Sequence, residues 1–186
     1  KRVQLSGSLA KGTALRSLND IDIACYISGA DAPRDVSKLL NYLAERLRTA
    51  FPNFSPDQVK PQTYSVTVSF RGSGLDVDVV PILYDGDPQW FGNLVSQDDG
   101  SLLETNIPFH LEFTQKRKQA QPTHFSQVVR LVKFWAQRIK RENDSFRFKS
   151  FMIEMILSRL CDKGLDFSDY PEALQHFFTY IARNNM

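Results

Sequence analysis

The pattern of apolar and polar positions predicts a strand-rich first part of the chain and a helical second part. The apolar run from Val3 to Leu5 predicts a buried strand that runs into a Gly-Ser turn. A second strand is predicted from Asn19 to Ile27. Side chains of a strand point alternately to its two faces, so Asp20 and Asp22 share one face of this strand.

An amphipathic helix is predicted after these two strands, from the stretch at Ala32 to a point before Pro52. Its apolar residues recur with the i, i+3, i+4, i+7 spacing of one helix face. They are Val36, Leu39, Leu40, Leu43 and Leu47. We expect this face to pack against the sheet.

A hairpin is predicted next. Residues 64–70 alternate cleanly between polar and apolar, Gly72-Ser73-Gly74 supplies the turn, and residues 75–81 return as the neighbouring strand. Asp76 and Asp78 lie on one face of the returning strand. An antiparallel pair here could bring one of them beside Asp20 and Asp22, but alternating acids also occur on solvent-facing strand edges.

The remaining chain divides into a loop-like stretch and a helical stretch. Residues 84–121 are expected to be loop-like because of turn signals such as Asp85-Gly86-Asp87-Pro88. From Thr123 the spacing predicts helices, with further helices over residues 149–156 and 171–183. The first of these has a core-facing stripe and a polar stripe that would ordinarily be solvated. The core-facing stripe is Phe125, Val128, Val129, Val132, Trp135 and Ile139, and the polar stripe is Arg130, Lys133, Gln137 and Arg141.

Composition is that of a folded domain without a membrane segment. The 186 residues are 42% hydrophobic and 24% charged, which suits one sizeable domain, or one with a helical extension. The net charge of +2 permits anionic substrates but does not indicate a strong nucleic-acid surface. Cys25 and Cys161 have no zinc-type spacing, so a reducing cytoplasm is expected. The chain begins at Lys1 without an initiating Met, so further residues are expected upstream.

The candidate chemistry lies around the first turn and the second strand. Gly7 lets the backbone approach another group closely, and amide groups of a Gly7-Ser8 turn can cradle phosphate oxygens. Asp20 and Asp22, facing such a turn, can hold Mg²⁺ that bridges to a nucleoside triphosphate. Taken alone, Asp-x-Asp is an ordinary polar strand face and Gly-Ser an ordinary turn. Together and in this order they predict phosphoryl or nucleotidyl transfer.

The order Gly7-Ser8, Gly12-Thr13, Asp20-Ile21-Asp22 resembles the signature of the polymerase-β-like nucleotidyltransferases. The Gly12-Thr13 element is most similar to the oligoadenylate synthetases and the cGAS/DncV-like nucleotidyltransferases (CD-NTases). The resemblance implies an α/β (α+β) fold with a mixed or antiparallel sheet and a C-terminal helical half. On this basis residues 1–122 form the nucleotidyltransferase core, and residues 123–186 form a helical half that closes the active-site cleft.

The same resemblance suggests further site residues. Asp78, followed by Val-Val-Pro, is similar to the element that carries the third catalytic carboxylate, while Asp76 receives no role. The stretch from Leu131 to Trp135 is similar to the helix that carries a triphosphate-binding lysine, which assigns that role to Lys133.

A second helix that resembles one of the family begins at residue 149. Ser150 and Phe151 occupy the positions of a phosphate-contacting serine and a base-stacking aromatic residue, with Phe in place of the more usual Tyr. Lys149 is expected to assist with phosphate. Phe151 is equally compatible with core packing. Residues 105–110 also resemble a CD-NTase stretch, but no mechanism follows from them.

The function implied by the resemblance is cyclic oligonucleotide synthesis. Two Mg²⁺ (or Mn²⁺) ions would be bound by Asp20, Asp22 and Asp78. ATP, GTP or other NTPs would be joined into a cyclic di- or trinucleotide second messenger, of the kind used in antiviral defence, with release of pyrophosphate. A regulatory protein partner is possible, and no membrane partner is expected.

Three alternatives remain open from the sequence. A terminal nucleotidyltransferase would use the same acids but need an RNA acceptor, for which no long basic and aromatic track is present. An oligoadenylate-type enzyme switched by double-stranded RNA would need an extended basic face. An inactive nucleotide-binding scaffold is disfavoured by intact acids at all three positions.

Overall fold

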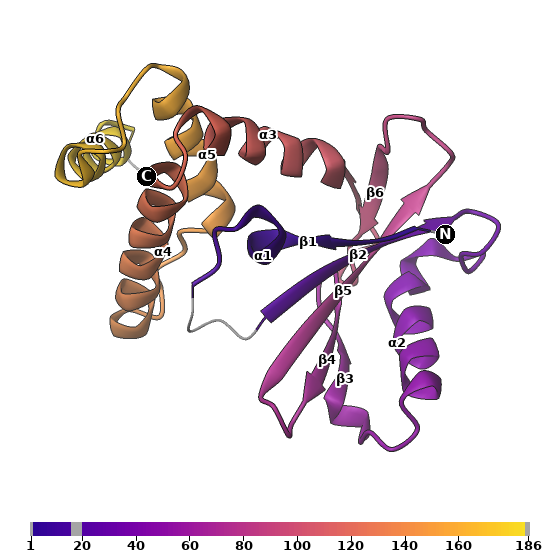
Figure 1. The fold of residues 1–186 in the computed structure, drawn as a ribbon. Helices are drawn as coiled ribbons and strands as arrows, with labels where there is room; N and C mark the ends of the chain where they lie inside the picture. Colours follow the sequence, from indigo (N-terminus) through magenta and orange to yellow (C-terminus); the bar gives the residue numbers. More distant parts are fainter. Residues whose placement is uncertain (1, 16–19, 185–186) are drawn as a thin grey trace. The chain divides into compact units, whose positions relative to one another are not determined.

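The computed structural model describes residues 2–15 and 20–184, which belong to two compact units (Figure 1). Unit 1 comprises Lys1–Ala10 and Ser17–His110, and unit 2 comprises Lys11–Arg16 and Leu111–Met186. The chain therefore leaves unit 1 briefly after residue 10 and permanently after residue 110. The predicted division between residues 122 and 123 did not place residues 11–16 with the helical part of the chain.

Unit 1 is built on a mixed sheet, as predicted. Over the described residues seven strands pair in the order β1-β2-β5-β4-β3, with β6 added to β5 and β7 to β6. β2 and β5 run parallel, whereas the β1–β2, β4–β5 and β3–β4 pairs are antiparallel. The strands are β1 Arg2–Ser6, β2 Asp20–Ser28, β3 Val59–Pro61, β4 Val66–Phe70, β5 Leu75–Tyr84, β6 Gly92–Val95 and β7 Leu102–Thr105.

The predicted strands and hairpin are confirmed, with one correction to burial. β4 and β5 form the expected antiparallel hairpin, and β5 continues beyond the expected end at Pro81 to Tyr84. Val3 and Leu5 were expected to be buried, but their side chains are 67% and 45% exposed. The reason is that β1 stands at the end of the strand order and turns these alternate residues to solvent. Asn19, the expected first residue of the second strand, lies outside the described residues.

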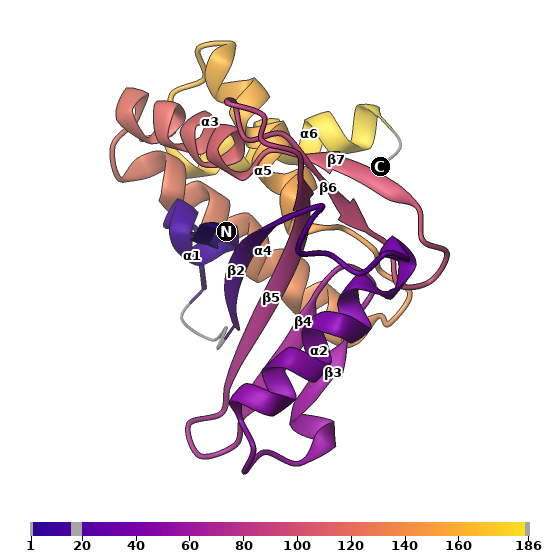
Figure 2. The same cartoon turned by 90° about the vertical axis from the view of Figure 1, so that its right-hand side faces the viewer.

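One face of the sheet in unit 1 is covered by helix α2, Leu39–Ala50 (Figure 2). Its apolar face packs on β3 and β4, as the periodicity predicted, in a cluster that also includes partly buried neighbours. The fully buried members of this cluster are Leu40, Leu43, Ala44, Val59, Val66 and Val68. Val36 was expected on the same apolar face but is 38% exposed, because it lies in a preceding 3-10 turn, η1 (Val36–Lys38), rather than in the helix. A second 3-10 turn, η2 (Pro56–Gln58), precedes β3.

The expectation of a loop over residues 84–121 is wrong. This stretch contains β6, β7 and a helix, α3 Ile107–Ala120. Asn106 begins the helix: its side-chain oxygen accepts the backbone N–H of Phe109, and its amide nitrogen donates to the carbonyl of Gln89. The stretch 105–110, which had no assigned mechanism, thus contains the N-cap of α3. Strands of four residues are too short for their periodicity to stand out against the turn residues that flank them.

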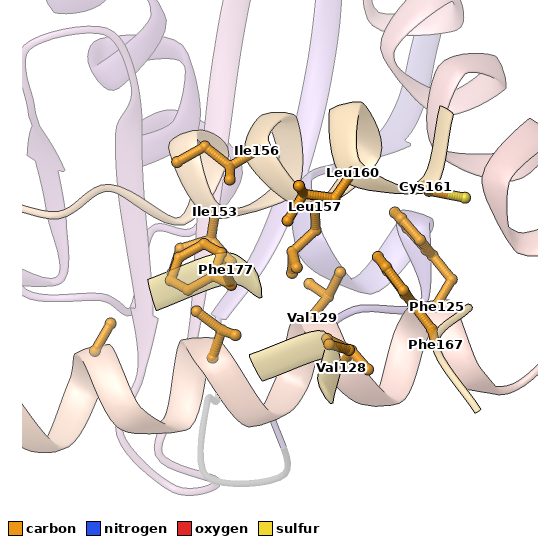
Figure 3. Close-up of a cluster of buried hydrophobic side chains, with 13 residues drawn as sticks. Phe125, Val128, Val129, Ile153, Ile156, Leu157, Leu160, Cys161, Phe167 and Phe177 are labelled. Carbon is orange, nitrogen blue, oxygen red and sulfur yellow. The ribbon is translucent and has the colours of Figure 1, made fainter. Parts of the chain in front are cut away.

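Unit 2 is helical, as predicted. Its helices α4 (His124–Glu142), α5 (Ser150–Asp162) and α6 (Tyr170–Arg183) share one apolar core (Figure 3). The figure shows Ile153 and Leu157 of α5 pointing toward α4, which carries Val128 and Val129. α6 begins at Tyr170-Pro171, where Asp169 accepts the backbone N–H of Glu172. Within the described part of the chain, no helix has both the length and the apolarity to span a membrane.

Candidate active site

The acidic side chains of unit 1 come together through the parallel pairing of β2 and β5. The register sets Asp20 opposite Asp76 and Asp22 opposite Asp78. Because strand side chains alternate, all four carboxylates lie on the same side of the sheet. We call this group the acidic face. It contains the three aspartates that were predicted to bind metal, Asp20, Asp22 and Asp78.

The acidic face holds like charges close together. Burial raises the pKa of Asp20 above its ordinary value, and the negative charges of Asp78 and Asp76 raise it further. Asp78 accepts a hydrogen bond from the hydroxyl of Thr67 on the neighbouring strand, which fixes one of its two carboxylate oxygens. Such a group of carboxylates attracts a cation, because a cation would relieve their mutual repulsion.

Gly7 connects the predicted phosphate turn to the acidic face. Its backbone has φ +63°, a conformation that side chains with a β-carbon rarely adopt. A β-carbon placed on Gly7 would lie 1.7 Å from Oδ2 of Asp22, so only glycine fits here. Gly7 is also the first residue of the short helix α1, Gly7–Lys11, with Ser8 in its first turn. The structure therefore brings the Gly-Ser turn directly against one of the predicted metal ligands.

The chemistry of the acidic face fits a divalent cation, although a finished ligand cluster is not formed. Among the residues that the structure describes, no three His, Cys, Asp or Glu side chains are arranged to hold one ion. The donor set is nonetheless what Mg²⁺ prefers, namely carboxylate oxygens. Burial and, after it, the negative charges of Asp78 and Asp76 raise the pKa of Asp20, and a cation would oppose both effects. The assignment of Asp20, Asp22 and Asp78 as metal ligands stays a prediction.

Three predicted nucleotide-binding residues of unit 2 lie together at the beginning of α5. Lys149 is its N-cap residue, and Ser150 and Phe151 are its first two residues. All three are exposed, and the Phe151 side chain keeps 50% of its surface accessible. Core packing, the alternative interpretation of Phe151, is therefore wrong. An exposed helix N-terminus with a serine and a lysine suits an anionic group.

Lys133 lies in a different environment from the one expected for the polar stripe of α4. Only 4% of Lys133 is exposed, so this residue is not part of a solvated surface. Its Nζ donates to Oε1 of Glu154 at 2.7 Å and to the hydroxyl of Thr13 at 3.1 Å. The assignment of Lys133 to triphosphate binding stays a prediction. A test of it has to separate loss of phosphate binding from loss of the buried ion pair with Glu154.

The sequence interpretation did not single out Glu154, and it assigned no role to Lys11 or to Thr13 of the Gly12-Thr13 element. Glu154 is 6% exposed and accepts hydrogen bonds from Thr13 and from the Nζ of Lys11. Lys11 also lies over the ring of Phe151, with Nζ 5.7 Å from the ring centroid. A signal was present in the sequence, since Glu154 is the single charge in the apolar run Phe151-Met152-Ile153-Glu154-Met155-Ile156. A carboxylate in such a run is usually buried together with a partner.

Comparison with known proteins gives relatives along the whole chain. No protein-family model matches it. A curated protein named cyclic AMP-AMP-AMP synthase, from Escherichia coli strain MS 115-1, is 69% identical over all 186 residues. CBASS oligonucleotide cyclase CdnC from E. coli strain KTE188 is 33% identical and is also matched over the whole chain. The chain spans 58% and 59% of the lengths of these two relatives.

Solved structures agree with these relatives. E. coli MS115-1 CdnC with ATP has 71% sequence identity and a TM-score of 0.85, covering 97% of this chain and 57% of that one. The same CdnC has also been solved in complex with HORMA-ΔN, with 70% identity and a TM-score of 0.84, covering 97% of this chain and 56% of that one. At 18% identity, Elizabethkingia meningoseptica CdnE shares the fold with a TM-score of 0.75, covering 98% of this chain and 70% of that one. The predicted resemblance to the cGAS/DncV-like nucleotidyltransferases (CD-NTases) is therefore confirmed along the whole of this chain.

Proposed function

We propose that this chain carries the nucleotidyl-transfer site of an enzyme that joins nucleoside triphosphates into a cyclic oligonucleotide and releases pyrophosphate. The observation that carries the proposal is the acidic face, in which parallel pairing sets Asp22 beside Asp78 while Gly7 packs against the Asp22 carboxylate. A phosphate-holding turn in contact with a metal-binding carboxylate is what transfer at an α-phosphate requires.

Each predicted residue has a distinct role in this proposal. Asp20 and Asp22 hold the divalent metal, and Asp78 completes the ligand set and can accept the proton of the attacking ribose hydroxyl. Two bound Mg²⁺ or Mn²⁺ ions would lower the pKa of that hydroxyl and neutralise the charge of the leaving pyrophosphate. Phosphate binding is assigned to Ser8, Lys149 and Ser150.

Phe151 is assigned to stacking on a nucleobase. Its exposed ring suits this role, and base stacking on an aromatic side chain tolerates different bases because every base has a π-face. Phenylalanine lacks the phenolic hydroxyl of tyrosine, so selection of the base has to come from other groups.

ATP is the proposed substrate and a cyclic trinucleotide the proposed product. The support is the 69% identity to a protein named cyclic AMP-AMP-AMP synthase. Each phosphodiester bond of the ring would form by attack of a ribose hydroxyl on an α-phosphate, with loss of one pyrophosphate. The sequence alone left the base and the ring size open.

A protein partner and a reducing compartment complete the proposal. CdnC, 70% identical, has been solved in complex with HORMA-ΔN, which supports regulation of this enzyme by a partner of that kind. We assign the protein to a reducing cytoplasm, which agrees with Cys25 and Cys161 not being joined in a disulfide. The proposed role is that of a second-messenger synthase in antiviral defence, which the naming of a 33% identical relative as a CBASS cyclase supports.

The test is incubation of the purified protein with labelled ATP and Mg²⁺ or Mn²⁺, without RNA, followed by chromatography before and after phosphatase treatment. A cyclic product has no terminal phosphate and therefore resists phosphatase. Phosphatase-sensitive linear chains, or growth of an added RNA, would contradict the proposal. A calorimetric titration with a non-hydrolysable ATP analogue forms the second arm, and failure to bind it in the presence of Mg²⁺ would count against any nucleotidyl transfer.

A further inference from the structure

The Gly-Thr segment, residues 11–13, is held within unit 2 by side chains from three helices. Three consecutive backbone carbonyls of this segment each accept a hydrogen bond from a different basic side chain, contributed by α3 or α4. The bonds are Lys118 Nζ to Lys11 O at 3.2 Å, Arg130 Nη2 to Gly12 O at 2.8 Å and Lys133 Nζ to Thr13 O at 3.4 Å. Carbonyls outside a helix or sheet need such partners when they are withdrawn from water.

Glu154 of α5 binds the side chains of the same segment. Its Oε1 accepts the hydroxyl of Thr13 at 2.9 Å and Nζ of Lys133 at 2.7 Å, and its Oε2 accepts Nζ of Lys11 at 2.7 Å. Thr13 is completely buried and Glu154 is 6% exposed. We call Lys118, Arg130, Lys133 and Glu154 the clamp.

Within the clamp, Glu154 forms ion pairs with Lys133 and with Lys11 of the segment, whereas Lys118 and Arg130 bond to backbone carbonyls. Burial acts to raise the pKa of Glu154, but the ammonium groups of Lys11 and Lys133 outweigh burial and hold it below its ordinary value. A buried ion pair is often no more stabilising than apolar residues of the same size. Added stability alone therefore does not explain the clamp. We explain it by the single position in which it holds the Gly-Thr segment.

The backbone of the segment is adapted to the clamp. Gly12 has φ +69°, and a β-carbon on it would lie 2.8 Å from Nζ of Lys118. Glycine thus permits both the conformation and the approach of the lysine. In the sequence, the segment lies between the Gly7-Ser8 turn and Asp20.

We propose that Thr13 and Glu154 are positioning residues that fix the Gly-Thr segment to the helices of unit 2, and that Lys133 belongs to this clamp. The segment follows shortly after the Gly7-Ser8 turn in the chain, and we expect its order to affect catalysis for that reason. Its effect on catalysis rests on the proposed function, whereas its effect on the order of residues 11–13 does not.

The proposal differs measurably from direct triphosphate binding by Lys133. If Lys133 bound phosphate, Glu154 would compete with the nucleotide for its ammonium group, and Glu154→Gln would tighten ATP binding. If Lys133 serves the clamp, Glu154→Gln loosens the segment and gives no gain in affinity.

The experiment compares Thr13→Val with Thr13→Ser, and both with Glu154→Gln. Valine keeps the shape of threonine but loses the hydroxyl, whereas serine keeps the hydroxyl. Arg138→Ala is the control on α4, since it removes an exposed ion pair with Glu142. Hydrogen exchange of the amides of residues 11–13, the kcat and KM for ATP, and the affinity for a non-hydrolysable ATP analogue are measured for each variant.

Thr13→Val and Glu154→Gln are expected to accelerate exchange in the segment on the order of ten- to a hundred-fold and to lower kcat more than they raise KM. Thr13→Ser should recover most of both effects, and Arg138→Ala should show neither. Unchanged exchange in Thr13→Val, or tighter ATP binding in Glu154→Gln, would overturn the proposal. If the wild-type protein makes no cyclic product, the proposed function fails, but hydrogen exchange still decides whether the clamp orders the segment.

Discussion

The two units use charge in opposite ways. In unit 1 the acidic face gathers four aspartates on neighbouring strands, and the pKa of Asp20 is raised by burial and by the charges of Asp78 and Asp76. In unit 2 a single buried glutamate is paired with two lysines, and its pKa is lowered despite burial. In the first region like charges lie side by side, whereas in the second a buried carboxylate is bonded to ammonium groups of opposite charge.

This difference separates groups that await a ligand from groups that support the structure. Like charges held together weaken the folded state unless something compensates them, so they indicate a site for a cation. Opposite charges that satisfy one another in the interior indicate a fixed geometry instead. Changes to the two regions should therefore fail in different ways: loss of chemistry with the fold intact in unit 1, and loss of order or stability in unit 2.

The largest expected effect comes from removing a metal ligand. Asp22→Ala should lower turnover on the order of a thousand-fold or more, because the bound metal supplies most of the stabilisation of the transferring phosphate. The fold should persist, since the change relieves repulsion on the acidic face. Product formation and the thermal midpoint of unfolding are measured together. A folded Asp22→Ala protein with turnover within a few-fold of wild type would show that the acidic face is not the metal site.

Asp78 and Asp76 sharpen the comparison within the acidic face. The register places Asp78 beside Asp22 and Asp76 beside Asp20. Asp78→Asn should retain nucleotide binding but lose product formation by a factor on the order of a hundred or more, because a carboxylate beside the acceptor hydroxyl is needed as ligand and base. Asp76→Asn, the matched control on the same strand, should change turnover only a few-fold. The reverse result would move the third ligand to Asp76.

Gly7 tests whether the turn and the acidic face have to touch. Gly7→Ala imposes a positive φ on alanine and drives its β-carbon into Asp22. Gly86→Ala is the matched control, because Gly86 has φ +88° but nothing within 4 Å of an added β-carbon. We expect Gly86→Ala to cost about 1 kcal/mol of folding free energy and no activity. Gly7→Ala should cost about 1–3 kcal/mol and most of the activity. Urea denaturation measures the folding free energy of each variant, and turnover measures its activity. Equal losses of both in the two variants would show that only backbone strain matters at Gly7.

The sequence was informative wherever a long periodic pattern determined the structure. The hairpin of β4 and β5, the helix α4 and the start of α6 at Tyr170-Pro171 follow from apolar spacing and turn chemistry. The family and the fold class followed from the motif residues and are confirmed. Short strands such as β6 and a helix as weakly amphipathic as α3 gave no such pattern.

Burial of individual residues was harder to predict than the elements themselves. Val3 and Leu5 read as buried because they are apolar, but their strand stands at the end of the strand order. Lys133 was predicted to bind triphosphate from a polar stripe that would ordinarily be solvated, but it is buried and bonds to Glu154 and Thr13. Both outcomes depend on tertiary partners far away in the sequence, which periodicity within one element does not contain.

The last effect we expect is a pH-dependent change in stability, and it tests the buried ion pairs of Glu154 directly. The pKa of Glu154 is lowered in the folded protein from its ordinary value of 4.5 by Lys11 and Lys133, which outweigh burial. A carboxyl group with a lowered folded-state pKa contributes stability above its unfolded pKa, and this contribution is lost as the pH falls through the folded-state pKa. Glu154→Gln should therefore lower the free energy of unfolding by about 2 kcal/mol near neutral pH, and the difference from wild type should shrink well below pH 4.5. Glu142→Gln, which removes the exposed carboxylate paired with Arg138, should cost less than about 0.5 kcal/mol. Urea unfolding across the pH series measures both, and a Glu154→Gln difference that stayed constant from neutral to acidic pH would show that shape rather than charge makes the clamp.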